Sequence, residues 1–191
     1  IVYNGMLVRD WSGDENQWYH NDPLGEGAWR GYNLAQGGPA GRDGFMTADA
    51  PGAGVLILGG ADRAGEVAEG SYNDLFRWTP GGQWSQLDDG AGNAPSPRAF
   101  FGDMVFDPIR NQTILFGGGQ RRSDGRYNLQ YDTWAWDGRA WTQLLSDHPA
   151  GWPPRSEEFS GHRLVFDRSR GQVVLLDNGS VSTAYGVRAV P

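Results

Sequence analysis

Three arginines recur along this chain, and each follows a short segment that contains proline. They are Arg42, Arg98 and Arg155, in Pro39-Ala40-Gly41-Arg42, Pro95-Ser96-Pro97-Arg98 and Trp152-Pro153-Pro154-Arg155. A guanidinium presents a planar set of N–H donors that matches a carboxylate, a sulfate or a phosphate, so these residues are candidate binders of an anionic ligand. The alternative is that each arginine bonds loop carbonyls or an acid within or beside its own unit. A side chain that recurs in every unit usually has a structural role that every unit requires.

Two loops carry charges that do not repeat. Residues 61–72 carry acids, whereas residues 119–131 carry arginines. The charged residues singled out are Asp62, Glu66, Glu69, Arg121, Arg122 and Arg126. Loops that differ on a repeated scaffold are where binding specificity is expected, so both loops are candidate ligand sites. The alternative is two solvated loops of opposite sign that contact each other or a neighbouring subunit.

Three tryptophans, Trp11, Trp29 and Trp152, have no counterpart elsewhere in the chain. On an exposed loop, such rings stack on a sugar or on the surface of a partner; the alternative is that they plug a loop. Trp29 and Tyr32 lie in the glycine-rich stretch 22–42, which is longer than its counterparts and is the best candidate for a functional insertion.

Residues for metal binding and nucleophilic catalysis are sparse. The chain has no cysteine, which excludes disulfides, thiolate metal sites and cysteine nucleophiles. Glu158 and His162 lie four positions apart and are the candidate metal ligands. One such pair does not define a site, and we expect neither a metal nor a cofactor.

The chain repeats itself at an interval of about 58 residues, since the second glycines of two Gly-Gly pairs, Gly60 and Gly118, are 58 positions apart. The matched segments are 74–78 with 132–136, 84–87 with 141–144, and 45–49 with 103–107 and 162–167. A repeat of this length is one supersecondary unit that must stack on copies of itself to bury its faces.

Each unit divides into four short strands. A half-apolar segment ending in aspartate and a turn precede an unbroken apolar run (55–58, 114–116 and 173–176), which is typical of a strand covered on both faces. A tryptophan hairpin follows, and Asp137-Gly138 is a tight-turn signal within it. The predicted fold class is therefore all-β, with four-stranded antiparallel units that describe β-propeller blades. Trp78, Trp84, Trp136 and Trp141 are expected to pack between blades, and Asp49, Asp107 and Asp167 to cap turns.

The order of these motifs (Arg, apolar-Asp, apolar-Gly-Gly, Asp-x-x-x-Trp, Trp) resembles the kelch repeat, a family that includes the central domain of galactose oxidase. The resemblance covers nearly the whole chain, although Leu176-Asp177-Asn178-Gly179 replaces the glycine pair in the third unit. It implies that the segments entering the first strands lie near a central channel, which would place Arg42, Arg98 and Arg155 around one mouth. It also implies a hydrogen-bonding core role for His162.

We divide the chain, as one domain, into half a blade (1–22), two blades (42–88 and 98–145) and half a blade (155–179). Propeller rings usually contain about four to eight blades, and half blades would expose strand edges. Two copies would solve both problems if the halves paired across a homodimer and closed a six-bladed ring. The alternatives are that the chain belongs to a longer propeller, or that its two termini pair within a three-bladed ring.

Composition excludes several classes of partner. The 191 residues suffice for one domain with a sizeable core. A net charge of -7 argues against nucleic acid and anionic membrane surfaces, and no apolar run approaches the roughly 20 residues of a membrane span. Because Ile1 is not an initiator methionine, we expect a processed, trimmed or excerpted chain; the compartment stays open, with an extracellular or periplasmic one favoured.

These features favour a non-catalytic binding module that engages a protein or a glycan at one face or channel mouth, because the strong motifs all recur and no catalytic set converges. One alternative is a carbohydrate-active enzyme, such as an epimerase or a lyase. The copper-radical oxidases of the kelch family are excluded, because they need a Tyr–Cys crosslink and this chain has no cysteine. The other alternative is a structural subunit whose half blades serve self-assembly.

Overall fold

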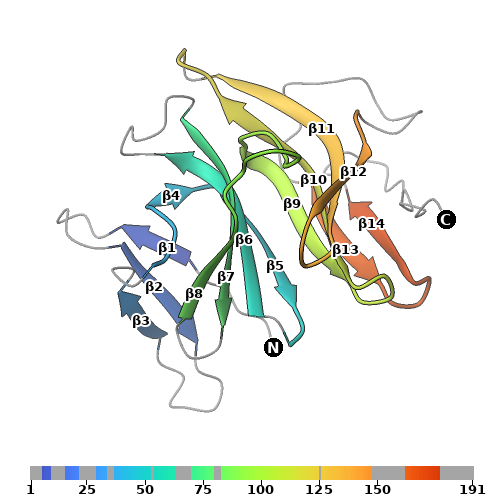
Figure 1. Ribbon diagram of the computed structural model, residues 1–191, viewed down its shortest axis with the longest axis horizontal. Coiled ribbons are helices and arrows are strands. Elements are labelled where there is room, and N and C mark those ends of the chain that lie inside the picture. Colours follow the sequence, from blue (N-terminus) through green and yellow to red (C-terminus); the bar gives the residue numbers. More distant parts are fainter. Residues whose placement is uncertain are drawn as a thin grey trace.

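The computed structural model describes residues 6–9, 16–21, 29–33, 37–52, 54–62, 70–79, 83–124, 126–147 and 162–176. Every regular element in these segments is a β-strand, and the strands form four antiparallel sheets that lie side by side (Figure 1). The predicted all-β class, with antiparallel sheets of about four strands, is confirmed.

The two outer sheets are the smaller ones. The first sheet contains β1 (Met6–Arg9), β2 (Asn16–Asn21) and β3 (Trp29–Asn33) in that order, and the fourth contains β13 (Arg163–Asp167) and β14 (Gln172–Leu176). Leu7 pairs with Trp18, which agrees with the hairpin predicted for residues 1–22. Strand β3 lies in the stretch 22–42 and pairs with β2, so the first sheet extends beyond the predicted half blade.

The second and third sheets are copies of one arrangement. The second contains β4 (Arg42–Asp43), β5 (Met46–Ala50), β6 (Gly54–Asp62), β7 (Ser71–Thr79) and β8 (Gln83–Asp88), and both β4 and β5 pair with β6. The third has the order β12-β11-β10-β9, from β9 (Ala99–Asp107), β10 (Gln112–Arg121), β11 (Tyr127–Trp136) and β12 (Trp141–Leu145). The predicted tryptophan hairpins are present in both, with Trp78 opposite Trp84 and Trp136 opposite Trp141.

The second, third and fourth sheets pack face to face through apolar side chains. One buried cluster joins the second and third sheets and includes Leu58, Leu75, Leu115 and Trp136. Another joins the third and fourth sheets through Ile114, Phe116, Tyr131, Ala135, Leu164, Val173 and Leu175. The apolar run 114–116 is therefore covered on both faces, as its composition predicts.

Strand β9 lies between β5 and β13, so the first long strands of successive sheets are neighbours (Figure 1). Asp103 of β9 bridges two sheets, because its carboxylate accepts the backbone N–H of Leu164 in β13 at 2.8 Å. Burial raises the pKa of Asp103, although this bond and the N–H of Met104 oppose the shift.

The second and third sheets each have two distinct ends. At the glycine end, which holds Gly59-Gly60, Gly117-Gly118 and the β10–β11 hairpin, the strand register shifts, and all four glycines have positive φ. At the turn end are the β5–β6, β9–β10 and β11–β12 turns. The carboxylate of Asp107 accepts the N–H groups of Ile109 and Arg110 there, at 2.9 and 3.1 Å, which confirms its predicted capping role.

Candidate functional site

Arg98 lies at the glycine end, but its side chain is fully buried within the third sheet. Its Nε donates to the carbonyl of Ser96 at 2.9 Å, and Nη1 donates to the carbonyl of Gly117 at 2.8 Å. Nη1 and Nη2 also donate to the two carboxylate oxygens of Asp132, at 2.8 and 3.1 Å. Burial alone would raise the pKa of Asp132, but the hydrogen bond and the charge of Arg98 hold that pKa below its usual value.

Arg42 makes the same set of contacts in the second sheet. It donates to the carbonyls of Ala40 and Gly59, at 3.0 and 2.9 Å, and to both carboxylate oxygens of Asp74. The guanidinium also lies 4.0 Å from the centre of the Tyr72 ring. Both arginines thus bond backbone carbonyls and an acid within their own sheet, which is the alternative to a ligand site. Arg155 lies outside the described residues, so a three-arginine anion site has no support from this geometry.

The arginine-rich loop is a tight hairpin at the glycine end. The backbone N–H of Arg122 donates to the carbonyl of Arg126 at 2.8 Å, and Arg121 pairs with Tyr127 where β10 meets β11. Arg122 and Arg126 are exposed to solvent. Arg122 also lies 3.4 Å from the carboxylate of Asp124, and both of these side chains are about half exposed. Such a surface ion pair contributes little to stability and leaves the cations accessible.

The other predicted site residues are placed only in part. The backbones of Trp29 and Tyr32 lie in β3, but their side chains, and that of Arg121, are outside the description. Glu66, Glu69, Trp152 and Glu158 lie outside the described residues altogether. The predicted roles of these residues stay predictions.

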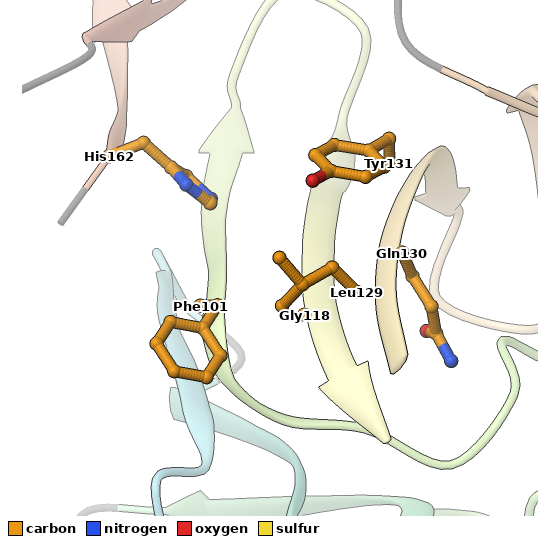
Figure 2. Close-up of a pocket in the computed structure, with 6 residues that line it drawn as sticks. All are labelled: Phe101, Gly118, Leu129, Gln130, Tyr131 and His162. Carbon is orange, nitrogen blue, oxygen red and sulfur yellow. The ribbon is translucent and has the colours of Figure 1, made fainter. Parts of the chain in front are cut away.

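His162 is buried between the third and fourth sheets, where its ring packs edge-on against Phe116 at a centroid distance of 5.3 Å. It borders a hollow too narrow for a water-sized sphere, which Phe101, Gly118, Leu129, Gln130 and Tyr131 complete. Figure 2 shows the rings of His162 and Tyr131 pointing toward one another across this hollow, whereas Gln130 points away. Among the described residues, no group of three or more His, Cys, Asp or Glu side chains could hold a metal ion.

A half-buried aromatic cluster at the glycine end had not been singled out from the sequence. It consists of Phe100, Phe101 and Tyr127, whose ring centres lie 5.3–6.2 Å apart. Phe100 and Phe101 have φ values of 48° and 50°, in the left-handed region that bulky residues avoid. We refer to these three residues as the aromatic cluster.

The repeat explains how the backbone reaches this conformation. Gly44 takes the position of Phe100 in the second sheet, two residues after the matched arginine, and it has a φ of 60°. The Phe100 ring occupies the space beside Gly44, because a Cβ built on Gly44 would lie 2.2 Å from the ring. The backbone N–H of Phe100 also donates to the carbonyl of Gly44 at 2.7 Å. The sequence contained this signal, since Gly44 and Phe100 each stand two residues after a recurring arginine.

The aromatic cluster and the arginine hairpin adjoin one another. Tyr127 is the first residue of β11 and follows Arg126 directly, so the hairpin emerges from the cluster. Beside them lies a polar hollow of about 210 Å³, lined by Leu129, Gln130, Tyr131, Asp132, Ser146 and Asp147. Apolar ring surface and accessible cations are therefore available together at this end.

Comparison with known proteins identifies a fold but no family. No protein-family model and no curated protein matches this chain. The solved structure of YjhT is similar, with a TM-score of 0.55 and 13% sequence identity, over 89% of this chain and 47% of that one. This chain thus spans about half the length of YjhT, and the likeness concerns the fold alone. None of the described residues forms a helix long and apolar enough to cross a membrane.

Proposed function

We propose that this chain is a non-catalytic binding module, built from kelch-type propeller blades, that binds an acidic segment of a partner protein at its glycine end. One observation carries the proposal. The second and third sheets have the same arrangement of strands and the same buried arginine. At the glycine end, however, the third sheet has Phe100 where the second has Gly44.

The backbone conformation is unfavourable for phenylalanine. A left-handed conformation costs a residue with a side chain about 1–2 kcal/mol relative to glycine, and two consecutive phenylalanines adopt it here. Strained residues of this kind concentrate at functional sites, where the surrounding structure holds them in the unfavourable conformation. This backbone conformation places two half-buried rings next to the arginine hairpin.

The chemistry of this surface determines what it would bind. The rings of the aromatic cluster offer apolar contact area, and the guanidinium groups of Arg122 and Arg126 offer donors for carboxylates. A protein segment with acidic and apolar side chains satisfies both. Drug-sized ligands usually occupy hollows of about 300–1,000 Å³, larger than the 210 Å³ beside Asp132. A projecting hairpin with exposed arginines therefore favours a protein segment over a small molecule or a sugar.

The buried arginines argue against a ligand site built on Arg42 and Arg98 and direct the proposal to other residues of the glycine end. The guanidinium groups of Arg42 and Arg98 are engaged by Asp74 and Asp132 within their own sheets. Their positive charges are therefore matched inside the fold and do not converge on a common ligand.

The test uses fluorescent peptides of alternating glutamate and leucine, with lysine–leucine peptides as the opposite-charge control. We expect binding of the acidic peptides that weakens with salt, and a loss of at least about tenfold in the double variant Arg122→Glu/Arg126→Glu. Arg139→Glu is the matched control, because Arg139 is also exposed but lies in the β11–β12 turn at the other end. It should retain most of the affinity.

Phe100→Gly separates the site from the fold. The substitution removes a binding ring but relieves the backbone, so we expect weaker peptide binding with a change in unfolding free energy below about 1 kcal/mol. If the wild type bound glycans on an array but no acidic peptide, the result would support a glycan as the ligand of this site. Binding of neither would refute the proposal.

We also propose that the outer sheets are completed by further strands, either from a second copy that closes a six-bladed ring or from the rest of a longer propeller. In the described part of the chain, β14 has a partner on one edge only, and so does β1. Exposed strand edges tend to pair with other strands. Light-scattering mass tests the homodimer, since twice the chain mass supports it and a stable monomer contradicts it.

A further inference from the structure

A second unusual position lies at the turn end, away from the proposed peptide site. Arg77 in β7 pairs with Leu56 in β6, whose side chain belongs to the core between the second and third sheets. Cross-strand partners share a face, so Arg77 points toward the third sheet. Its counterpart in the third sheet is Ala135, which is 1% exposed in the core. The second sheet thus carries a guanidinium at the position where the third sheet carries a buried methyl group.

The bonding of Arg77 differs from that of Arg42 and Arg98. Its Nε is buried and has no hydrogen-bond partner among the described residues, whereas the residue as a whole is half-buried. The other two arginines each have two oxygens of an aspartate and two backbone carbonyls. A buried donor left without an acceptor is destabilising, and such groups usually have a partner in a native protein.

Arg77 lines a groove between the two sheets. The groove has a volume of about 130 Å³, and its other lining residues include Leu56, Leu87, Phe106, Asn111 and Trp136. This space holds several water molecules or one short organic group. Its lining is mixed, with the apolar residues Leu56, Leu87, Phe106 and Trp136 next to the polar residues Arg77, Asn111, Thr113 and Asp137.

The charges at the groove restrict the ligand. Asp137 also lines it, and the Oδ1 of Asp137 accepts the backbone N–H groups of Arg139 and Ala140, both at 2.8 Å. These bonds hold the pKa of Asp137 below its usual value, so this carboxylate is ionised at neutral pH. The groove thus presents one guanidinium and one carboxylate. Because the carboxylate repels a doubly charged anion more strongly, a singly charged anion is favoured.

We propose that this groove binds a carboxylate that carries a short apolar group, with Arg77 holding both carboxylate oxygens and Trp136 and Phe106 contacting the apolar part. A guanidinium fork matches a carboxylate, and the bond supplies the acceptor that the buried Nε of Arg77 lacks among the described residues. The ligand is either a free small acid or the terminal carboxylate of a peptide. This site is independent of the peptide site at the glycine end.

The experiment uses isobutyrate as the free acid, and a short peptide ending in valine, together with its C-terminal amide, as the peptide probe. Tryptophan fluorescence and calorimetry would follow binding. We expect saturable binding of isobutyrate, of the free-acid peptide, or of both, and no binding of the amide. Binding of the peptide but not isobutyrate identifies a peptide terminus as the source; binding of isobutyrate alone identifies a free acid.

The decisive variant is Arg77→Ala, which installs the residue of the sister sheet. We expect at least tenfold weaker binding, with an unfolding midpoint equal to or above that of the unliganded wild type. Isobutyrate should raise the midpoint of the wild type but not that of the variant. Arg139→Ala, in the turn beside the groove, controls for general charge and should bind normally. Equal binding by Arg77→Ala, or no saturable binding of either probe by the wild type, would overturn the proposal. Acidic-peptide binding at the glycine end should survive Arg77→Ala.

Discussion

Replacement of Arg98 by alanine would remove the group that ties the entry of β9 to the rest of the third sheet. In the folded protein, its guanidinium bonds the carbonyls of Ser96 and Gly117 and both carboxylate oxygens of Asp132, over distances of 2.8–3.1 Å. The variant leaves the carbonyl of Gly117 without this donor. It also leaves the Asp132 carboxylate, which is 13% exposed, without its cation.

The expected loss follows from the burial of the pair. Removal of one partner of a buried ion pair destabilises a protein by about 3–5 kcal/mol, because the remaining charge is uncompensated. Asp132 keeps some solvent contact and a 2.6 Å hydrogen bond from Nε1 of Trp134, so we expect a value near the lower limit, about 3 kcal/mol. In a domain of this size, this loss lowers the unfolding midpoint by about 6–12 °C.

Urea unfolding monitored by tryptophan fluorescence measures this quantity, and the dependence on urea should keep its slope. A double-mutant cycle isolates the pair. Asp132→Asn removes the uncompensated charge, so Arg98→Ala/Asp132→Asn should be more stable than the sum of the two single losses predicts, by about 0.5–3 kcal/mol. Arg98→Lys keeps the charge without the paired N–H groups and should lie between wild type and alanine. Arg139→Ala, at an exposed turn, should change stability by less than about 0.5 kcal/mol.

Two results would refute this reasoning. One is a loss below about 1 kcal/mol for Arg98→Ala, which would show that the pair contributes little to the fold. The other is strict additivity in the cycle. Either result, combined with weaker binding of a carboxylate ligand by Arg98→Ala, would restore the hypothesis that this arginine serves a ligand.

Two further predictions concern packing and pH. Trp136 is 3% exposed and its ring centre lies 5.3 Å from that of Trp141, so Trp136→Ala should destabilise the protein by about 3–5 kcal/mol in urea unfolding; a loss under about 1 kcal/mol would contradict burial between the sheets. Asp103 and Asp132 should respond to pH in opposite directions, as measured by unfolding of wild type against each aspartate-to-asparagine variant. Burial raises the pKa of Asp103, so the folded protein takes up this proton before the unfolded chain, and wild type should gain stability relative to Asp103→Asn as the pH falls toward 3.8. Burial would also raise the pKa of Asp132, but Arg98 lowers it overall, so wild type should lose stability relative to Asp132→Asn as the pH falls below about 3.8; parallel slopes would contradict both assignments.

The strands and their turns were predictable from the sequence because neighbouring residues encode them. The apolar run 114–116, the Asp137-Gly138 turn and the capping Asp107 each act over a few positions, and each appears in the structure as expected. The interval of about 58 residues also predicted that the units are copies that stack on one another. Local turn chemistry and side-chain periodicity do not depend on distant contacts, so a single chain carries enough information for both.

The partners of the chemical groups were decided only by the tertiary structure. Arg98 and Asp132 both belong to recurring motifs but are far apart in the sequence. They meet only because β11 folds back along β10, and this contact makes Arg98 part of a buried ion pair instead of a ligand site. Phe100 acquires its strained backbone because the repeat imposes there a conformation that suits the glycine of the sister sheet. Arg77 faces a groove because the third sheet packs against the second. These relations join residues far apart in the chain, and the stacking of whole sheets fixes them, which local sequence patterns do not encode.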